Sequence, residues 1–110
     1  MKQTHTLKSY DKELGDLRTL ISQMGGYAEA QVRGATDALV SRDTEMAERV
    51  VAADKKLDDM ELELERRVVG IIARRSPVAD DLRGIIAALK ISGALERVGD
   101  YAKNIAKRAT

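Results

Sequence analysis

The sequence predicts an all-α protein, an elongated antiparallel three-helix bundle. Apolar residues recur at alternating spacings of three and four along three long segments, which is the pattern of helices that each bury one face. No segment alternates with the period of two that a half-buried strand requires. Because turns of only two or three residues join the three segments, neighbouring helices are expected to run antiparallel.

The first segment predicts one long helix over residues 7–41, after a disordered start at residues 1–6. The bundle is therefore expected to span residues 7–110. Gly25 and Gly26 fall inside the helical pattern, although two glycines in a helix interior cost about 2 kcal/mol relative to alanine. They mark either a tolerated weak point or the close approach of a neighbouring helix. The apolar positions of this segment, interrupted at Gln31, are Leu7, Tyr10, Leu14, Leu17, Ile21, Met24, Ala28, Ala35 and Ala38.

The second helix is predicted from Thr44 to about Arg75, with Asp43 as its N-cap, since an Asp side chain accepts a hydrogen bond from the free N–H groups of a first turn. Its core seam is Met46, Val50, Ala53, Leu57, Met60, Leu64 and Ile71. A row of carboxylates lies beside this seam on the same helix. Their spacings of four, three and four place them on one face: Asp54, Asp58, Glu61 and Glu65.

The third helix is predicted to begin at Ser76 and Pro77 and to end near Ala109. Ser76 is the expected N-cap, Pro77 suits the first helical position, and two aspartates supply an acidic first turn. The buried face is expected to change midway along this helix. Its first half buries Leu82, Ile85, Ile86 and Leu89, and its second half has a seam on the opposite side at Ile91, Leu95, Val98, Ala102 and Ile105.

This change of face has two consequences for the third helix. Glu96 and Asp100 lie opposite the second seam, so they are expected at the margin of the bundle. A helix with apolar residues on both sides also indicates that part of its surface meets another domain or subunit.

The composition disfavours several classes of protein. A net charge of +1 from 19 basic and 18 acidic residues, with three aromatic residues, argues against a nucleic-acid surface. No apolar run reaches the roughly 18 residues of a membrane span, and the N-terminus lacks the apolar core of a signal peptide, so a cytoplasmic location is expected.

Catalysis is not expected from this sequence. The single histidine, His5, lies in the segment expected to be disordered, so no serine has a histidine partner in a structured element. No glycine-rich loop follows a strand to hold a phosphate group. An oxygen-ligand metalloenzyme remains a third alternative, which would require measurable turnover.

Two acidic pairs form the candidate binding site. Asp54 and Asp58 are four residues apart, as are Glu96 and Asp100, so each pair lies on one face of its helix. Counted from the turn between the second and third helices, the two pairs lie at nearly the same height. Because the chain has no cysteine, the site would bind hard cations such as Mg²⁺, Mn²⁺, Ca²⁺ or iron through oxygen. The alternative is a solvated acidic surface, balanced by Lys55, Lys56, Arg97 and Lys103.

Several motifs resemble the PhoU proteins, and together they cover nearly the whole chain in order. The motif in the first helix is Met24-Gly25-Gly26. The motifs in the second are Arg49-Val50-Val51-Ala52-Ala53-Asp54 and Met60-Glu61. The turn region carries Ile71-Ile72-Ala73-Arg74-Arg75-Ser76-Pro77 and Asp80-Asp81-Leu82-Arg83. The closest match is Leu95-Glu96-Arg97-Val98-Gly99-Asp100.

The resemblance implies a single three-helix repeat of a protein that usually has two. It implies a regulator of phosphate uptake and phosphate-starvation signalling, acting between the ATPase of the phosphate ABC transporter and the sensor histidine kinase PhoR. It also implies metal ions, of iron, zinc, magnesium or manganese, at acidic pairs that match Asp54 with Asp58 and Glu96 with Asp100. Glu61 and Asn104 extend the same faces as secondary candidates.

The sequence thus predicts a non-enzymatic, metal-binding signalling adaptor that pairs as a homo-oligomer through its uncovered apolar faces. The alternative is a metal-free helical scaffold or dimerisation module whose acidic rows are solvated surface.

Overall fold

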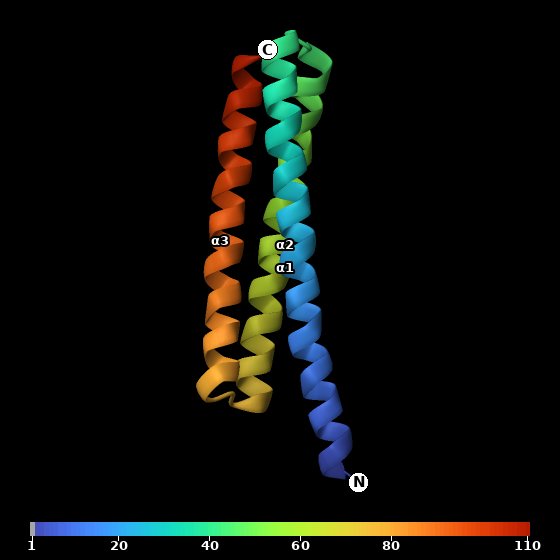
Figure 1. Ribbon diagram of the computed structural model, residues 1–110, viewed down its shortest axis with the longest axis vertical. Coiled ribbons are helices and arrows are strands. Elements are labelled where there is room, and N and C mark those ends of the chain that lie inside the picture. The colour runs from blue at the N-terminus through green and yellow to red at the C-terminus, as the bar shows by residue number, and fades with distance from the viewer. Residues whose placement is uncertain (1) are drawn as a thin grey trace.

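Three helices form an elongated bundle in the computed structural model, which describes the backbone of residues 2–110 and the side chains from residue 8 onward (Figure 1). The helices are α1 (Lys2–Ser41), α2 (Thr44–Arg75) and α3 (Ala79–Arg108). Each helix packs against the other two, and the molecule measures 60 × 21 × 17 Å. Because α2 runs antiparallel to both α1 and α3 (Figure 1), the predicted all-α antiparallel bundle is confirmed.

The first helix is longer than the sequence predicts. α1 begins at Lys2 rather than at Leu7, and its first turns extend past the turn between α2 and α3 (Figure 1). A disordered segment at residues 1–6 stays a prediction, since its first residue and its side chains lie outside the described part. A Cβ added at Gly25 or Gly26 would meet no atom within 4 Å. The glycine pair is therefore a tolerated weak point of α1 and does not mark a close helix contact.

The turn between α1 and α2 contains the predicted cap. Asp43 Oδ1 accepts a hydrogen bond of 3.0 Å from the backbone N–H of Met46. The backbone N–H of Asp43 donates to the carbonyl of Ala38 at 2.9 Å, which ties the same residue to the end of α1. A cap of this kind stabilises a helix by about 1 kcal/mol. The start of α2 at Thr44 is thus fixed by Asp43.

The prediction that Ser76 caps α3 is wrong. Ser76 ends α2, because its backbone is left-handed at φ 45° and its N–H donates to the carbonyl of Ile72 at 3.2 Å. A residue in that conformation cannot also take the extended backbone of an N-cap. Pro77 follows, in a position where proline is common because it cannot continue a helix. α3 begins at Ala79, with the two predicted aspartates in its first turn.

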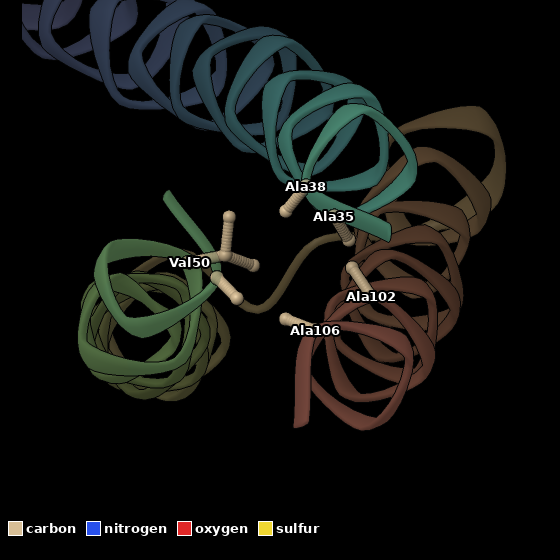
Figure 2. Close-up of a cluster of buried hydrophobic side chains, with 6 residues drawn as sticks. Ala35, Ala38, Val50, Ala102 and Ala106 are labelled. Carbon is tan, nitrogen blue, oxygen red and sulfur yellow. The ribbon is translucent and has the colours of Figure 1, made fainter. Parts of the chain in front are cut away.

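The core follows the predicted seam of α2. Leu57, Leu64 and Ile71 are buried on α2 and meet Leu17 and Met24 of α1. At the end of the bundle near the α1–α2 turn, the core is built from small side chains. Figure 2 shows these pointing into the space between the three helices: Ala35 and Ala38 from α1, Val50 from α2, Ala102 and Ala106 from α3.

The predicted change of buried face in α3 is correct only in part. From the predicted second seam, Ala102 is buried and Leu95 packs against the core. One face of α3 stays toward the core at every seventh position: Ile85, Ser92, Gly99 and Ala106. Ile91 and Val98, from the predicted second seam, are 46% and 36% exposed, and Ile86 is 41% exposed. The physical reason is steric, because small side chains allow α3 to lie close to its neighbours while larger apolar ones remain outside.

Polar side chains of α1 hold the first half of α2 in place. Gln31 Nε2 donates to the carbonyl of Val50 at 2.8 Å, and the Tyr27 hydroxyl donates to the carbonyl of Ala53 at 3.0 Å. Gln31, which interrupts the apolar pattern of α1, is buried and its amide is paired. These two bonds secure the turn of α2 that leads into Asp54.

Candidate metal centre

Acidic residues of α2 and α3 meet midway along the bundle. Asp54, Asp58 and Asp100 can each place one carboxylate oxygen within 4.8 Å of the others, and we call them the three-carboxylate group. The two helices therefore bring the acidic residues together at one height, as their distances from the α2–α3 turn predict. Asp54 is buried, Asp100 is half-buried and Asp58 is exposed, so the group opens from the core to the surface.

Gly99 allows α3 to approach α2 at this group. A Cβ at Gly99 would lie 2.5 Å from Cδ2 of Leu57 and 3.3 Å from Oδ1 of Asp54. Any side chain at this position would force Leu57 or the two helices to shift. Gly99 therefore brings the adjacent Asp100 within reach of the carboxylates of α2.

Asp54 is the buried member of the group. It is 3% exposed, and among the described residues its Oδ1 has no hydrogen-bond partner. Its Oδ2 lies 3.7 Å from Nζ of Lys103, which is longer than a hydrogen bond. Burial, and then the charges of Asp58 and Asp100, raise the pKa of Asp54 above its usual value. An unpaired buried carboxylate oxygen is costly, and a bound cation would remove that cost.

Two glutamates border the three-carboxylate group. Burial, followed by a hydrogen bond with Asp100, raises the pKa of Glu96 to about 7. Burial and the charges of Glu65 and Asp58 raise the pKa of Glu61, which Arg97 partly opposes. The border of the site is therefore acidic as well, and like charges there favour protonation or a bound cation.

The structure brings together most of the residues predicted for the site. Glu96 and Asp100 are half-buried, as expected at the margin of the bundle. Glu61 adjoins the group, whereas Asn104 is exposed one turn beyond Asp100 on α3. The sequence analysis did not identify the role of Gly99. The pattern that could have indicated it is the repeat of small residues at every seventh position of α3, Ser92, Gly99 and Ala106. The ligand roles of all these side chains stay predictions.

The donor atoms fit a hard cation. All are carboxylate oxygens, which suit Mg²⁺, Mn²⁺ or Ca²⁺. Asp54 also has a buried oxygen without a partner, so the residues fit a metal ion on grounds other than their charge. Asp54, Asp58 and Asp100 would hold the ion, whose contribution would be to neutralise facing negative charges.

The fold and this group define a class: an all-α, three-helix unit with an acidic, candidate cation site between α2 and α3. None of the described helices is both long and apolar enough to cross a membrane. The PhoU domain family matches residues 21–109, and the chain belongs to that family.

Relatives support this assignment over nearly the whole chain. The phosphate-specific transport system accessory protein PhoU homolog of Zymomonas mobilis is 52% identical over 104 residues, 94% of this chain and 44% of that protein. The homolog of Caulobacter vibrioides is 51% identical over 105 residues, 96% of this chain and 46% of that protein. The chain therefore spans less than half the length of these relatives.

A solved structure has the same fold. The crystal structure of PhoU from Pseudomonas aeruginosa matches with a TM-score of 0.88 and 41% identity, covering 91% of this chain and 48% of that chain. The resemblance found in the sequence motifs is thereby confirmed.

Proposed function

We propose that the chain is a regulatory accessory unit of phosphate-specific transport that binds metal at the three-carboxylate group. Its family membership and the names of its relatives support the link to phosphate transport. The observation that carries the metal proposal is the convergence of three carboxylates on a buried Asp54 whose Oδ1 has no partner among the described residues. The chain is proposed to be cytoplasmic and non-enzymatic, and to act as an adaptor.

The proposed mechanism is electrostatic. A cation bound by Asp54, Asp58 and Asp100 would neutralise carboxylates that otherwise repel one another across the α2–α3 contact. The bound state would therefore hold α3 more firmly against α2. The outer surface of the two helices would then be presented in one arrangement to a partner protein.

A pair of neighbouring aspartates gives a matched test of the site. Asp58 belongs to the three-carboxylate group, whereas Asp59 is exposed on the same turn of α2 and is not part of it. Asp58→Asn should weaken the binding of Mg²⁺ or Mn²⁺ in calorimetric titration, and Asp59→Asn should leave it unchanged. Equal effects of the two substitutions would contradict the proposal.

A second test removes the acidic residues of α3. Glu96→Ala combined with Asp100→Ala should remove bound metal while circular dichroism shows the helices intact. Elemental analysis of freshly purified protein would measure the metal content and identify the ion as iron, zinc, magnesium or manganese. Unchanged metal content in the double variant would refute the site.

The alternative proposal is a metal-free helical scaffold or dimerisation module. The fact that favours it is the exposure of Asp58, since exposed acidic groups are common without an ion. A thermal melt with and without chelator separates the two proposals, because a ligand that binds only the folded state raises its stability. Coincident melts would favour the scaffold.

We also propose that the chain pairs with a second copy through the face between α1 and α3. An apolar groove lined by Leu14, Ile21, Ala88 and Ile91 opens on this face. Val98 is also exposed, two turns beyond Ile91 on α3. Sedimentation should show a dimer that Val98→Lys weakens. A monomer at high concentration, or a dimer insensitive to that substitution, would contradict this pairing.

The partner proteins are proposed from the family alone. They are the sensor histidine kinase PhoR and the ATPase of the phosphate ABC transporter, through which the chain would be peripheral to the membrane. Each should co-purify with the wild-type chain in Mg²⁺ and less with Asp58→Asn than with Asp59→Asn. Nucleic acid is not a proposed partner.

A further inference from the structure

Among the described residues, Lys103 is the only one whose positive charge pairs with the three-carboxylate group. Its Nζ lies 3.7 Å from Oδ2 of Asp54, and among the described side chains no other Lys or Arg lies within ion-pair distance of Asp54, Asp58 or Asp100. Lys103 follows Asp100 by three residues on α3, so both side chains lie along the same side of that helix. An ammonium group thus stands beside the site proposed for a metal ion.

The contact between Lys103 and Asp54 is weak. At 3.7 Å the ammonium is too far for a hydrogen bond, and Oδ1 of Asp54 remains without a partner in the described residues. The Lys103 side chain is 35% exposed, whereas that of Asp54 is 4% exposed. Lysine has a flexible stem, so the ammonium can move into solvent while the carboxylate cannot.

We propose that Lys103 is a displaceable counter-ion that competes with the metal ion for Asp54 and so lowers the metal affinity of the site. This proposal rests on the metal site proposed above. An ammonium and a divalent cation on one carboxylate repel each other, and the divalent cation is held by direct contacts with several oxygens. Metal binding therefore moves Lys103 away from Asp54 and toward the outer surface of α3.

A pair of lysines on α3 provides the test. Lys103→Met removes the competing charge, and Lys107→Met removes an exposed charge one turn further along the same helix. In calorimetric titration with Mg²⁺, Lys103→Met should bind about tenfold more tightly than the wild type. Lys107→Met should bind like the wild type.

The opposite role for Lys103 gives the opposite result. If the ammonium orients Asp54 for the metal, Lys103→Met would bind Mg²⁺ more weakly, and that result or an unchanged affinity would overturn the proposal. Lys103→Gln provides a second variant that removes the charge but keeps a polar side chain. It should also bind more tightly, provided that circular dichroism shows the same helices.

The position of the ammonium can be followed directly. The ¹³Cε signal of Lys103, assigned by its loss in Lys103→Met, should shift as Mg²⁺ is added and reach its limit when the site is saturated. The signal of Lys107 should stay constant. If the wild type binds neither Mg²⁺ nor Mn²⁺, the metal site itself fails. If it binds either ion while the Lys103 signal does not change, the metal site stands and the counter-ion proposal alone is refuted.

Discussion

Two charged regions of the bundle are built in opposite ways. Where the first half of α1 meets the end of α2, Glu13 faces Arg74 at 3.2 Å and Arg75 at 2.9 Å. The Arg75 guanidinium also lies 5.7 Å from the centre of the Tyr10 ring. In the three-carboxylate group, acidic residues face one another, and Lys103 provides one long contact.

The pKa shifts of the carboxyl groups in the two regions have opposite signs. Hydrogen bonding to Arg75 holds the pKa of Glu13 below its usual value, so this region favours the charged carboxylate. Burial raises the pKa of Asp54, of Glu61 and of Glu96. The first region therefore favours its charged carboxylate, whereas a proton or a cation would stabilise the second. This contrast is what makes the second region a candidate binding site.

The largest expected effect comes from separating α2 and α3 at the acidic region. Gly99→Ala should lower the free energy of unfolding by about 2 to 3 kcal/mol, because the new methyl group would overlap Leu57. Urea unfolding of the purified variant measures this change. Any metal affinity should also fall, because Asp100 would move away from the carboxylates of α2.

Gly26→Ala is the control for that prediction. A Cβ at Gly26 meets no atom within 4 Å, so alanine should stabilise α1 by up to about 1 kcal/mol through its higher helix propensity. If both alanine variants changed stability alike, the close approach at Gly99 would not be what separates them.

The next prediction compares the two regions directly. Glu13→Gln should lower the free energy of unfolding at neutral pH by about 1 to 2 kcal/mol, because it leaves two arginines without their acidic partner. Asp54→Asn, measured with chelator present, should lower it less or raise it, because it removes one of several like charges. A larger loss for Asp54→Asn would reverse the comparison.

The pH dependence of stability should differ in sign between the regions. The raised pKa of Glu96 means that the folded state holds more protons than the unfolded state between the ordinary value of 4.5 and about 7. Its contribution to stability is therefore full below 4.5 and is lost as the pH rises to about 7. The lowered pKa of Glu13 stabilises the fold above its ordinary value of 4.5, and that contribution is lost as the pH falls further.

Chemical unfolding in the presence of chelator across this pH range measures both losses of stability, the one at rising pH and the one at falling pH. Since Glu96 is partly exposed, its contribution to the free energy of unfolding should amount to about 1 kcal/mol after solvent screening. Glu96→Gln should reduce the loss of stability above pH 4.5, to which Asp54 and Glu61 also contribute. Glu13→Gln should reduce the loss of stability below pH 4.5. A Glu96→Gln profile that matches the wild type would show that Glu96 does not titrate in this window.

The sequence predicted the fold well where large apolar residues define the buried face. The seam of α2 and the cap at Asp43 were both correct, because Leu57 and Leu64 have no stable position outside the core. The errors occurred where small residues face inward. On α3 the buried positions include Ser92 and Gly99, so the exposed Ile91 and Val98 gave the stronger but misleading pattern.

The residues of the candidate site were predictable and its electrostatics were not. Equal distances from the α2–α3 turn were enough to bring Asp54 and Asp58 to the height of Asp100. The burial of Asp54 depends on how closely Gly99 lets α3 approach, which no spacing along one helix reveals. The pairing of Lys103 with Asp54 depends on the rotation of α3 about its axis, which the spacing of residues along one helix does not define.

The smallest expected effect gives a baseline for both regions. Arg33 pairs with Glu29 at 2.6 Å on the outside of α1, where both side chains are about 70% exposed (71% and 69%). Arg33→Ala should change the free energy of unfolding by less than about 0.5 kcal/mol, because exposed ion pairs are screened by water and salt. The change should shrink further in 1 M NaCl, measured by the same urea unfolding. If Arg33→Ala lowered the free energy of unfolding as much as Glu13→Gln, burial would not strengthen the ion pairs of Glu13. The comparison of the two regions depends on that effect of burial.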